Sequence, residues 1–268
     1  MENVPGLLSM RTKKDEPVKN IILQEQRKIG YNVTIIKLNS ADYRIPQQRH
    51  RIFFTGIRKD HPFHPEKLTP PPKILNKKDY ITVSDAISDL PIIHAKEGKE
   101  IQEYNKPPQN KYQEYCRKNS NKVYNHISMR HTNRIIERFK QIQQGESVTN
   151  VDKKYGQRKR GDPTKISGKA YNQNNYRVYS DKPSPTITAS FQSNFIHPYL
   201  NRNFTAREAA RLQSYPDNYI FKGNRTNMSW DKNLSQYQQI GNSVPPLLSK
   251  AIAENITEYF SQKNIIKE

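Results

Sequence analysis

The spacing of apolar residues predicts regular structure near the start of the chain. In VKNIILQEQRKIG, apolar positions 18, 21, 22 and 29 fall roughly on one stripe and Gly30 follows, which predicts a helix between Asp15 and Gly30. The β-branched run YNVTIIKLNS predicts a buried strand, and a second strand is expected from Arg51 to Ile57. This order of elements is typical of the late part of an α/β sheet.

Regular structure returns near the end of the chain. The segment NFTAREAARLQSYP offers Asn203 or Thr205 as a helix cap, Glu208 three residues after Thr205, and Pro216 beyond the end. In QQIGNSVPPLLSKAIAENI, the chain is expected to turn at Gly241-Asn242 and to enter a helix there. Apolar positions 244, 248, 252 and 256 then lie four residues apart on one face of that helix.

The middle of the chain is polar and irregular. A Pro-rich, charged stretch marks a boundary near residues 68–77, and residues 80–215 are rich in Lys, Asn, Tyr and Gln. Within them a helix is expected in HTNRIIERFKQIQQG and a strand in SPTITASF. The basic segment KKYGQRKRGDPTK is predicted to be a loop. It is either a solvated, mobile surface or a phosphate contact, and the sequence leaves both open.

Charge and cysteine content narrow the class of protein. The 268 residues include 45 Lys and Arg against 25 Asp and Glu, a net charge of +20. Such a charge favours nucleic acid as the partner, although a basic surface without a bound partner would have the same composition. The lone cysteine, Cys116, excludes disulfides and Cys-based zinc sites within the chain. No metal site is expected, because HPFHP has no third ligand in register. Without a membrane-length apolar run or a signal peptide after Met1, we expect a cytoplasmic protein.

Four motifs together resemble one family. ENV at Glu2, QQRHR at 47–51, REAARLQSYP at 207–216 and GNSVP at 241–245 are similar to the sixth, eighth, ninth and tenth conserved blocks of the DNA cytosine-5 methyltransferases. Each motif is short, but their order, with a variable polar region between the second and third, is specific. The resemblance covers nearly the whole chain but only the second half of the family's catalytic unit.

The resemblance implies a fold and a domain plan. The fold class is α/β: the second half of a Rossmann-like methyltransferase sheet, with a smaller, mostly irregular or β target-recognition domain. Residues 1–79 would belong to the catalytic domain and residues 80–215 would form the recognition domain, with the ninth block at its end. Residues 216–268 would form a hinge and the C-terminal helix that returns to the catalytic domain.

The resemblance also implies a reaction. The family moves a methyl group from S-adenosylmethionine to carbon 5 of a cytosine flipped out of the duplex, after a cysteine thiolate adds to carbon 6. That addition needs a proton or a strong hydrogen bond at ring nitrogen 3. By resemblance Glu2 would supply it, with a pKa raised by burial, unless this residue is disordered. Arg51 would stabilise charge on the exocyclic oxygen. Arg49 would brace the site, unless the two arginines are an exposed pair at a strand start.

Further residues are carried over from the same resemblance. Asn242 and Ser243 would line the methyl-donor pocket, or only cap a helix. The Thr186-Ile187 pair is similar to the Thr-Leu element of recognition domains. Arg177 would read base edges, and Gln47 is placed in the DNA-binding set, although each could be a plain surface residue. Finally, three residues of the ninth block would brace the small domain through ion pairs: Arg207, Glu208 and Arg211.

Two of the family's motifs are absent from the sequence. The Phe-x-Gly-x-Gly loop for the methyl donor is missing, and so is the Pro-Cys that carries the thiolate. Cys116 follows Tyr in the variable region and is not expected to be the nucleophile. The chain could therefore be the second subunit of a split enzyme of a restriction–modification system, completed by a partner chain. It could also be a truncated, inactive remnant, or a DNA-binding module without chemistry.

These interpretations predict how the chain should behave in solution. Half a sheet would expose an edge and apolar helix faces, so the chain alone should associate or be poorly soluble. Binding to DNA should weaken steeply with salt, because phosphate neutralisation would supply much of it.

Overall fold

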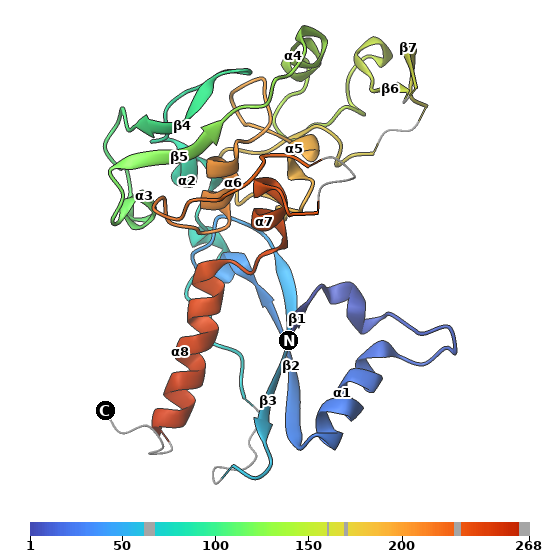
Figure 1. The fold of residues 1–268 in the computed structure, drawn as a ribbon, viewed down its shortest axis with the longest axis vertical. Helices are drawn as coiled ribbons and strands as arrows, with labels where there is room; N and C mark the ends of the chain where they lie inside the picture. Colours follow the sequence, from blue (N-terminus) through green and yellow to red (C-terminus); the bar gives the residue numbers. More distant parts are fainter. Residues whose placement is uncertain (62–67, 160, 169–170, 228–231, 263–268) are drawn as a thin grey trace. The chain divides into compact units, whose positions relative to one another are not determined.

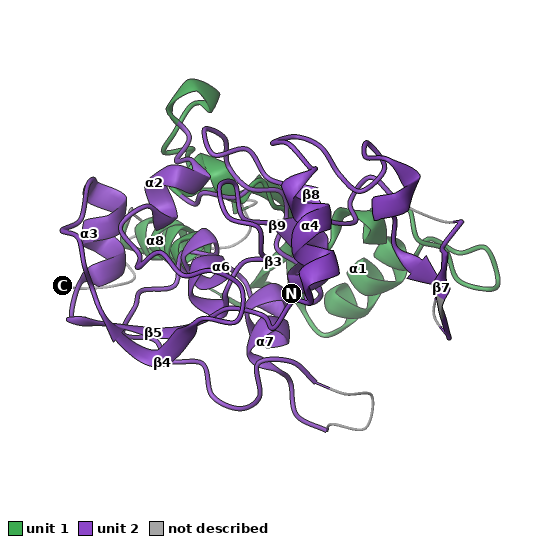
Figure 2. Cartoon of the chain, turned by 90° about the horizontal axis from the view of Figure 1, so that it is seen from above, with its two compact units in different colours: residues 1–44, 48–79, 247–268 green, residues 45–47, 80–246 purple. Residues whose placement is uncertain are grey.

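The computed structural model describes five stretches of the chain: 1–61, 68–159, 161–168, 171–227 and 232–262. Contacts between Cα atoms divide it into two compact units (Figure 2). Unit 1 gathers residues from both ends of the chain, and unit 2 gathers the middle. Their ranges are 1–44, 48–79 and 247–268 for unit 1, and 45–47 and 80–246 for unit 2.

Unit 1 is built on a three-stranded sheet in the order β1-β3-β2. The strands are β1 (Glu2–Asn3), β2 (Tyr31–Asn39) and β3 (His50–Arg58). The central strand β3 runs antiparallel to both neighbours. The two strands predicted from the sequence are therefore present, but β2 is only partly buried along most of its length rather than fully enclosed.

Helices flank this sheet in unit 1. The predicted N-terminal helix is α1 (Val18–Lys28), and Gly30 follows it with a φ of +90°, a conformation in which glycine has no Cβ clash. Helix α1 lies beside the strands of this sheet (Figure 1). The core between them combines buried and partly buried apolar side chains. They are Leu7, Ile52, Phe54, Leu8, Val18, Ile22, Leu23, Val33 and Ile35.

The C-terminal region differs from the prediction. Gly241-Asn242 do not open a helix but form the last turn of α7 (Gln236–Asn242), and the long helix α8 (Pro246–Gln262) begins four residues later. The side chain of Ser235 caps α7 in a reciprocal capping box with Gln238, a local signal for a separate helix. The apolar positions predicted for one long helix thus belong to α8 from Leu248 onward.

Unit 2 consists of short helices and two-stranded sheets. Two antiparallel pairs, β4-β5 and β6-β7, and one parallel pair, β8-β9, make up its described strands. The strands are β4 (Gly98–Glu103), β5 (Lys122–Ile127), β6 (Arg158–Lys159), β7 (Asp162–Ile166), β8 (Tyr176–Arg177) and β9 (Phe195–Ile196). The helices besides α7 are α2 (Val83–Ile87), α3 (Lys111–Arg117), α4 (Asn133–Lys140), α5 (Phe191–Asn194) and α6 (Ala206–Leu212).

Short 3-10 helices complete the described elements. They are η1 (Pro5–Leu8), η2 (Ser40–Tyr43), η3 (Lys77–Asp79) and η4 (Lys153–Tyr155).

Two predictions for the middle region need correction. SPTITASF is not a strand: only Ser184 makes a bridge, to Gln47, because the prolines on either side of it have no N–H to donate to a ladder. The basic segment is not only a loop, because β6 and β7 pair within it. Contacts group the described residues of 216–246 with unit 2 and α8 from residue 247 with unit 1, and the domain plan inferred from the sequence stays a prediction.

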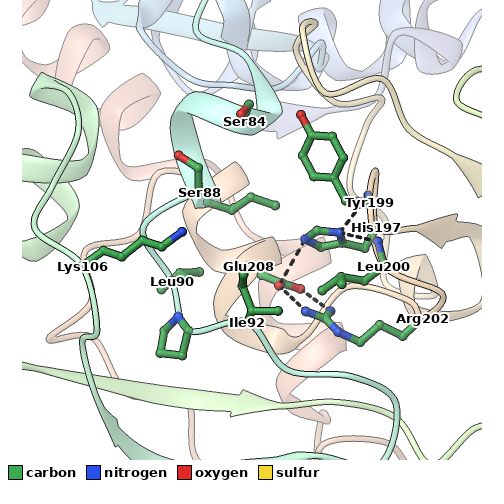
Figure 3. A pocket seen from close by; sticks show the side chains of 12 residues that line it. Ser84, Ser88, Leu90, Ile92, Lys106, His197, Tyr199, Leu200, Arg202 and Glu208 are labelled. Carbon is green, nitrogen blue, oxygen red and sulfur yellow. Dashed lines mark hydrogen bonds and ion pairs between the residues drawn. The ribbon is translucent and has the colours of Figure 1, made fainter.

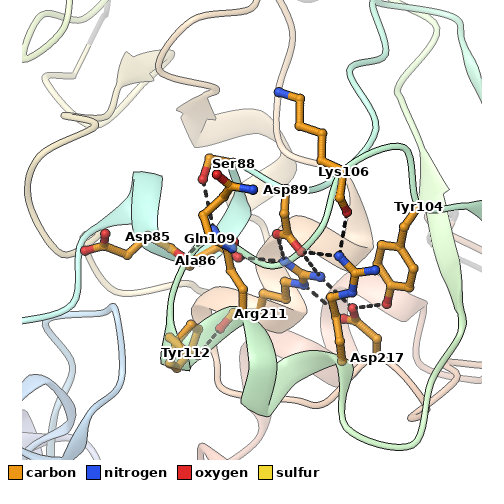
Figure 4. Close-up of polar contacts among 12 residues, drawn as sticks. Asp85, Ala86, Ser88, Asp89, Tyr104, Lys106, Gln109, Tyr112, Arg211 and Asp217 are labelled. Carbon is orange, nitrogen blue, oxygen red and sulfur yellow. Dashed lines mark hydrogen bonds and ion pairs between the residues drawn. The ribbon is translucent and has the colours of Figure 1, made fainter.

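The helix of the ninth block, α6, is confirmed and is braced by buried ion pairs (Figure 4). Arg211 pairs with Asp89 and with Asp217, the latter at 2.6 Å, and Arg207 reaches Asp217 at 3.5 Å. All four side chains are fully enclosed. Because an unpaired charge in such a place would be very costly, the pairing fixes α6 against α2 and the chain that follows α6.

Candidate active site

Glu2 and Arg51 meet on one face of the sheet in unit 1. Glu2 lies directly opposite Phe53 in the β1–β3 pairing, and Arg51 is two residues from Phe53, so both side chains project from the same face. The Nε atom of Arg51 donates to Oε1 of Glu2 at 2.9 Å. Two residues 49 positions apart in the sequence are thereby joined by strand register alone.

The pair is partly enclosed. The side chain of Arg51 is 12% exposed and that of Glu2 27% exposed. Burial lowers the pKa of Arg51 from its ordinary value, and the neighbouring charge of Glu2 acts in the opposite direction. Nη1 of Arg51 also donates to the His50 carbonyl at 2.7 Å, which orients the guanidinium. Glu2 is thus more open than the deep burial that the sequence analysis assumed for it.

Arg49 occupies a different environment from Arg51. It is 2% exposed, whereas Arg51 keeps an open side. Its backbone carbonyl accepts from the Ser40 N–H at 2.9 Å, and its N–H donates to the Asn39 side chain at 3.2 Å. This arrangement suits a bracing role at the start of β3 and not direct contact with a substrate.

A junction of glutamines, which the sequence analysis missed, joins three of the four motifs in unit 2. Gln47 and Gln213 are both fully buried. Nε2 of Gln47 donates to Oε1 of Gln213 at 2.5 Å and to the Leu212 carbonyl at 3.0 Å. In turn Nε2 of Gln213 donates to the carbonyls of Ile240 and Ser243 at 2.9 and 3.0 Å. The sequence signal for this junction was that QQRHR and REAARLQSYP each contain a glutamine.

The glycine of the GNSVP motif is required by close packing. A Cβ at Gly241 would lie 2.3 Å from the backbone carbonyl atoms of Thr188, far inside contact distance. Beside it Asn242 is exposed, and Ser243 is half-buried with its hydroxyl donating to the Ile240 carbonyl at 2.8 Å. The motif therefore packs helix α7 against the backbone of Thr188 and Ala189 and leaves one amide side chain open to solvent.

Arg177, predicted to read base edges, is instead enclosed in unit 2. It is 6% exposed, and burial lowers its pKa to about 10. All five of its N–H donors are used. Their acceptors are the carbonyls of Phe139, Ile142, His197 and Leu200 and the side chain of Asn201. We therefore revise its role to that of a structural anchor, because no donor is left for a base.

Two more residues of the predicted DNA-binding set are also enclosed. Ile187 is fully buried, and its N–H donates to Oε1 of Gln47 at 3.0 Å. Gln47 has both amide donors committed, as described above. In this arrangement Ile187 and Gln47 hold the chain around Ile187 in place. Thr186, which precedes Ile187, is half-buried and is the member of the set that retains an open surface.

Cys116 lies in the core of unit 2. It is fully buried, and burial raises the pKa of its thiol to about 12. A thiol in this state has almost no thiolate at neutral pH, so it has the properties of a structural cysteine. The prediction that it is not the nucleophile agrees with its surroundings.

A cavity of about 210 Å³ opens beside the ninth-block helix (Figure 3). Its inner wall carries Glu208, which forms two hydrogen bonds of 2.7 Å with Arg202. His197 lies on the same wall, with Nε2 at 3.7 Å from Glu208. Burial lowers the pKa of His197 to about 3, and Nδ1 accepts from two backbone N–H groups at 3.1 Å. The predicted ion pairing of Glu208 is confirmed, with Arg202 as its partner.

The described stretches offer neither a metal-binding cluster nor a membrane span. No group of three or more His, Cys, Asp or Glu in them is arranged to hold a metal ion. No helix there combines the length and the apolar character needed to cross a membrane.

Comparisons with known proteins agree with the motifs. The C-5 cytosine-specific DNA methylase family matches residues 1–258. The type II methyltransferase M.DdeI of Desulfomicrobium norvegicum is 56% identical over 268 residues, which is all of this chain and 64% of that protein. M.AquIB of Picosynechococcus is 32% identical over 139 residues, 51% of this chain and 88% of that relative.

A solved structure supports the fold. It is that of a protein assigned as a DNA modification methyltransferase encoded within an E. coli prophage, with a TM-score of 0.69 and 24% identity. The match covers 97% of this chain and 68% of that one. The mixed α/β class is thereby confirmed as a methyltransferase fold. This chain spans just under two thirds of the length of M.DdeI. With the family matched over nearly its whole length, the chain belongs to the C-5 cytosine-specific DNA methylases.

Proposed function

We propose that this chain supplies the proton donor, the guanidinium and the DNA-recognition part of a DNA cytosine-5 methyltransferase of a type II restriction–modification system. The observation that carries the proposal is the Glu2–Arg51 pair, in which side chains from two separate motifs meet at 2.9 Å. The 56% identity with M.DdeI over the full chain supports the same activity class. The net charge of +20 suits a polyanionic substrate.

The chemistry follows from the two side chains. Addition of a thiolate to carbon 6 of cytosine places negative charge on the ring. A carboxyl group at ring nitrogen 3 can donate a proton or a strong hydrogen bond there, and this is the role of Glu2. Arg51 stabilises charge on the exocyclic oxygen, since its guanidinium stays charged and is already oriented by the His50 carbonyl. The cytosine would displace the contact that now neutralises the two groups.

The methyl donor of this family is S-adenosylmethionine, which supplies the methyl group when bound. Asn242 offers an exposed amide. Beside it lies the half-buried Ser243 hydroxyl, which donates to the Ile240 carbonyl and accepts from Nε2 of Gln213 at 3.4 Å. These groups fit the polar parts of such a donor but would form only a part of its site. The Gly241 approach to Thr188 would keep them in position.

A complementary segment would supply the rest of the site. The sequence lacks the Phe-x-Gly-x-Gly loop and the Pro-Cys motif, and 64% of M.DdeI is matched. Among the described residues β1 pairs only with β3, so its other edge is open to a further strand. M.AquIB, of which 88% is covered by its alignment, shows that a type II methyltransferase chain can consist almost wholly of sequence like this one. We propose that the complement is a separate partner chain.

The test is reconstitution. The 268-residue chain is mixed with a family polypeptide that carries the two missing motifs, and transfer of a labelled methyl group from S-adenosylmethionine to duplex DNA is measured. We expect transfer only when both are present. If the mixture binds DNA but transfers no methyl group with any complement that folds, the chain is a remnant or a binding module and the proposal is wrong.

A further inference from the structure

A basic hairpin projects from one end of unit 2 (Figure 1). It consists of η4, β6 and β7, and we define it as the described residues of 153–166. These carry one acidic side chain, Asp162, which pairs with Lys165 at 3.4 Å. Lys153, Lys154 and Lys159 are exposed. The hairpin therefore presents cationic side chains to solvent with little local neutralisation.

The hairpin is held in place by a buried arginine of α4. Arg138 is 6% exposed, and its guanidinium donates to the carbonyls of Tyr155 and Gly156, the latter at 2.7 Å. Its Nη1 also donates to the side chain of Asn175 at 3.2 Å. One side chain thus ties η4 to α4 and to the chain before β8. A flexible surface loop would not have this buried attachment at its base.

Close packing stiffens the same region. A Cβ at Gly156 would lie 2.9 Å from both the Ile166 side chain and the Lys153 carbonyl, so η4 and β7 approach each other tightly. The Ser167 N–H donates to the Gln157 carbonyl at 2.6 Å, which closes the base of the hairpin. The backbone that carries the lysines is therefore fixed, and their charges have defined positions.

Positive charges converge at the attachment point. Burial lowers the pKa of Arg138, and the nearby charges of Arg134 and Arg158 lower it further. The acceptors of Arg138 described above are neutral oxygens. Clustering like charges is unfavourable in an isolated protein, but it favours an anionic partner whose charges would neutralise the cluster.

Resting on the proposed function, we propose that the basic hairpin and Arg134 bind the sugar–phosphate backbone of duplex DNA. Lysine and arginine are the usual phosphate partners, and such contacts fix the orientation of a protein on the duplex without reading its sequence. Base reading is left to other parts of unit 2. Arg138 is a positioning residue, since it holds the hairpin and does not itself reach solvent.

The test compares two pairs of exposed lysines in unit 2. The variant is Lys153→Ala with Lys154→Ala. The control is Lys111→Ala with Lys118→Ala, at the first residue and the C-cap of α3, a helix at the opposite end of the unit (Figure 1). Both remove two positive charges. Binding of the full chain to a fluorescein-labelled duplex of mixed sequence is measured by anisotropy over a range of KCl concentrations.

We expect the hairpin variant to flatten the plot of log affinity against log salt by about two, close to 0.9 for each lost phosphate contact, while the control keeps the wild-type slope. Equal slopes for both double variants would overturn the inference and leave the proposed function intact. If the wild-type chain fails to bind duplex DNA at all, both the inference and the recognition role in the proposed function are overturned.

A third variant tests the anchor. Arg138→Lys keeps the charge but cannot form the fork of hydrogen bonds to Tyr155, Gly156 and Asn175. We expect it to flatten the salt slope as well, because the hairpin lysines lose their fixed positions. A variant that melts at a lower temperature but keeps the wild-type slope would show that Arg138 is purely structural, which would overturn its positioning role.

Discussion

Glu2 and Arg51 come together because side chains on an antiparallel pair meet their diagonal neighbours on the same face. The sequence could indicate both residues through their motifs, and strand periodicity could place Arg51 and Phe53 on one face. It could not show that Arg177 and Gln47 would be enclosed. A polar side chain in an irregular segment gives no sign of which carbonyls will surround it, so enclosure is decided by the tertiary fold.

Replacing the acid tests the proposed chemistry. We expect Glu2→Gln to slow methyl transfer by the reconstituted enzyme by roughly two orders of magnitude, the usual scale for an acid–base group. Duplex binding by the same protein should not change. Glu16→Gln, at an exposed position of unit 1, is the matched control and should leave the rate unaltered. An unchanged rate for the Glu2 variant would remove this residue from the mechanism.

The revised role of Arg177 leads to a stability prediction. Arg177→Met would take one donor away from each of four backbone carbonyls and one amide oxygen, at a cost of about 3 kcal/mol or more in the free energy of unfolding. Urea denaturation measures this directly. Arg130→Met, at an exposed site, should change stability by less than about 0.5 kcal/mol. Full stability combined with loss of sequence preference would restore the base-reading role.

Elements with local signals were the predictable ones. Helix α1 has its own apolar periodicity and ends before Gly30, and α6 has the reciprocal capping box of Thr205 and Glu208 that the sequence indicates. The strand expected in SPTITASF has β-branched residues but no partner strand, and its Ile187 N–H goes to a glutamine side chain instead. Strand formation depends on a partner strand, which need not be near in the sequence, so this pattern alone was insufficient.

Buried histidines should make the stability of unit 2 depend on pH. Burial lowers the pKa of His131 to about 4 and that of His197 to about 3, below the ordinary value near 6.5 of an unfolded chain. Below about pH 6.5 the unfolded chain therefore binds protons that the folded one does not. Stability is complete above this pH and falls as the pH decreases toward the folded values, by about 1.4 kcal/mol per pH unit for each histidine.

Urea denaturation at about pH 7, 6 and 5 measures this dependence. His197→Asn keeps an acceptor for the Tyr199 and Leu200 N–H groups but does not titrate. The unfolding free energy of this variant should therefore fall less steeply with decreasing pH, by the contribution of one histidine. An unfolding free energy that stays constant over this range would contradict the assignment of neutral, buried histidines.

Both ends of the chain contribute to unit 1, through residues 1–44 and 48–79 and again through α8, and unit 2 is formed mainly by the residues in between. The Pro-rich stretch signalled a change of character near residue 79. No composition change marks the return near residue 246, because α7 and α8 are separated by only a few residues. The function of each unit stays a prediction.

The unpaired edge of β1 should affect behaviour in solution. With an open edge at β1, the chain alone is expected to self-associate in a concentration-dependent way, and a complementary polypeptide should suppress this. Sedimentation velocity with and without the complement measures the effect. A monodisperse monomer that melts cooperatively by itself would argue against a missing neighbour at this edge.

The division of labour between two polypeptides is the central claim, and transfer of a labelled methyl group to duplex DNA tests it most directly. The account predicts no transfer by this chain alone, and transfer when a polypeptide with the donor-binding loop and the nucleophilic cysteine is added. Methyl transfer by the isolated chain would contradict it, because the fully buried Cys116 would then have to act as the nucleophile.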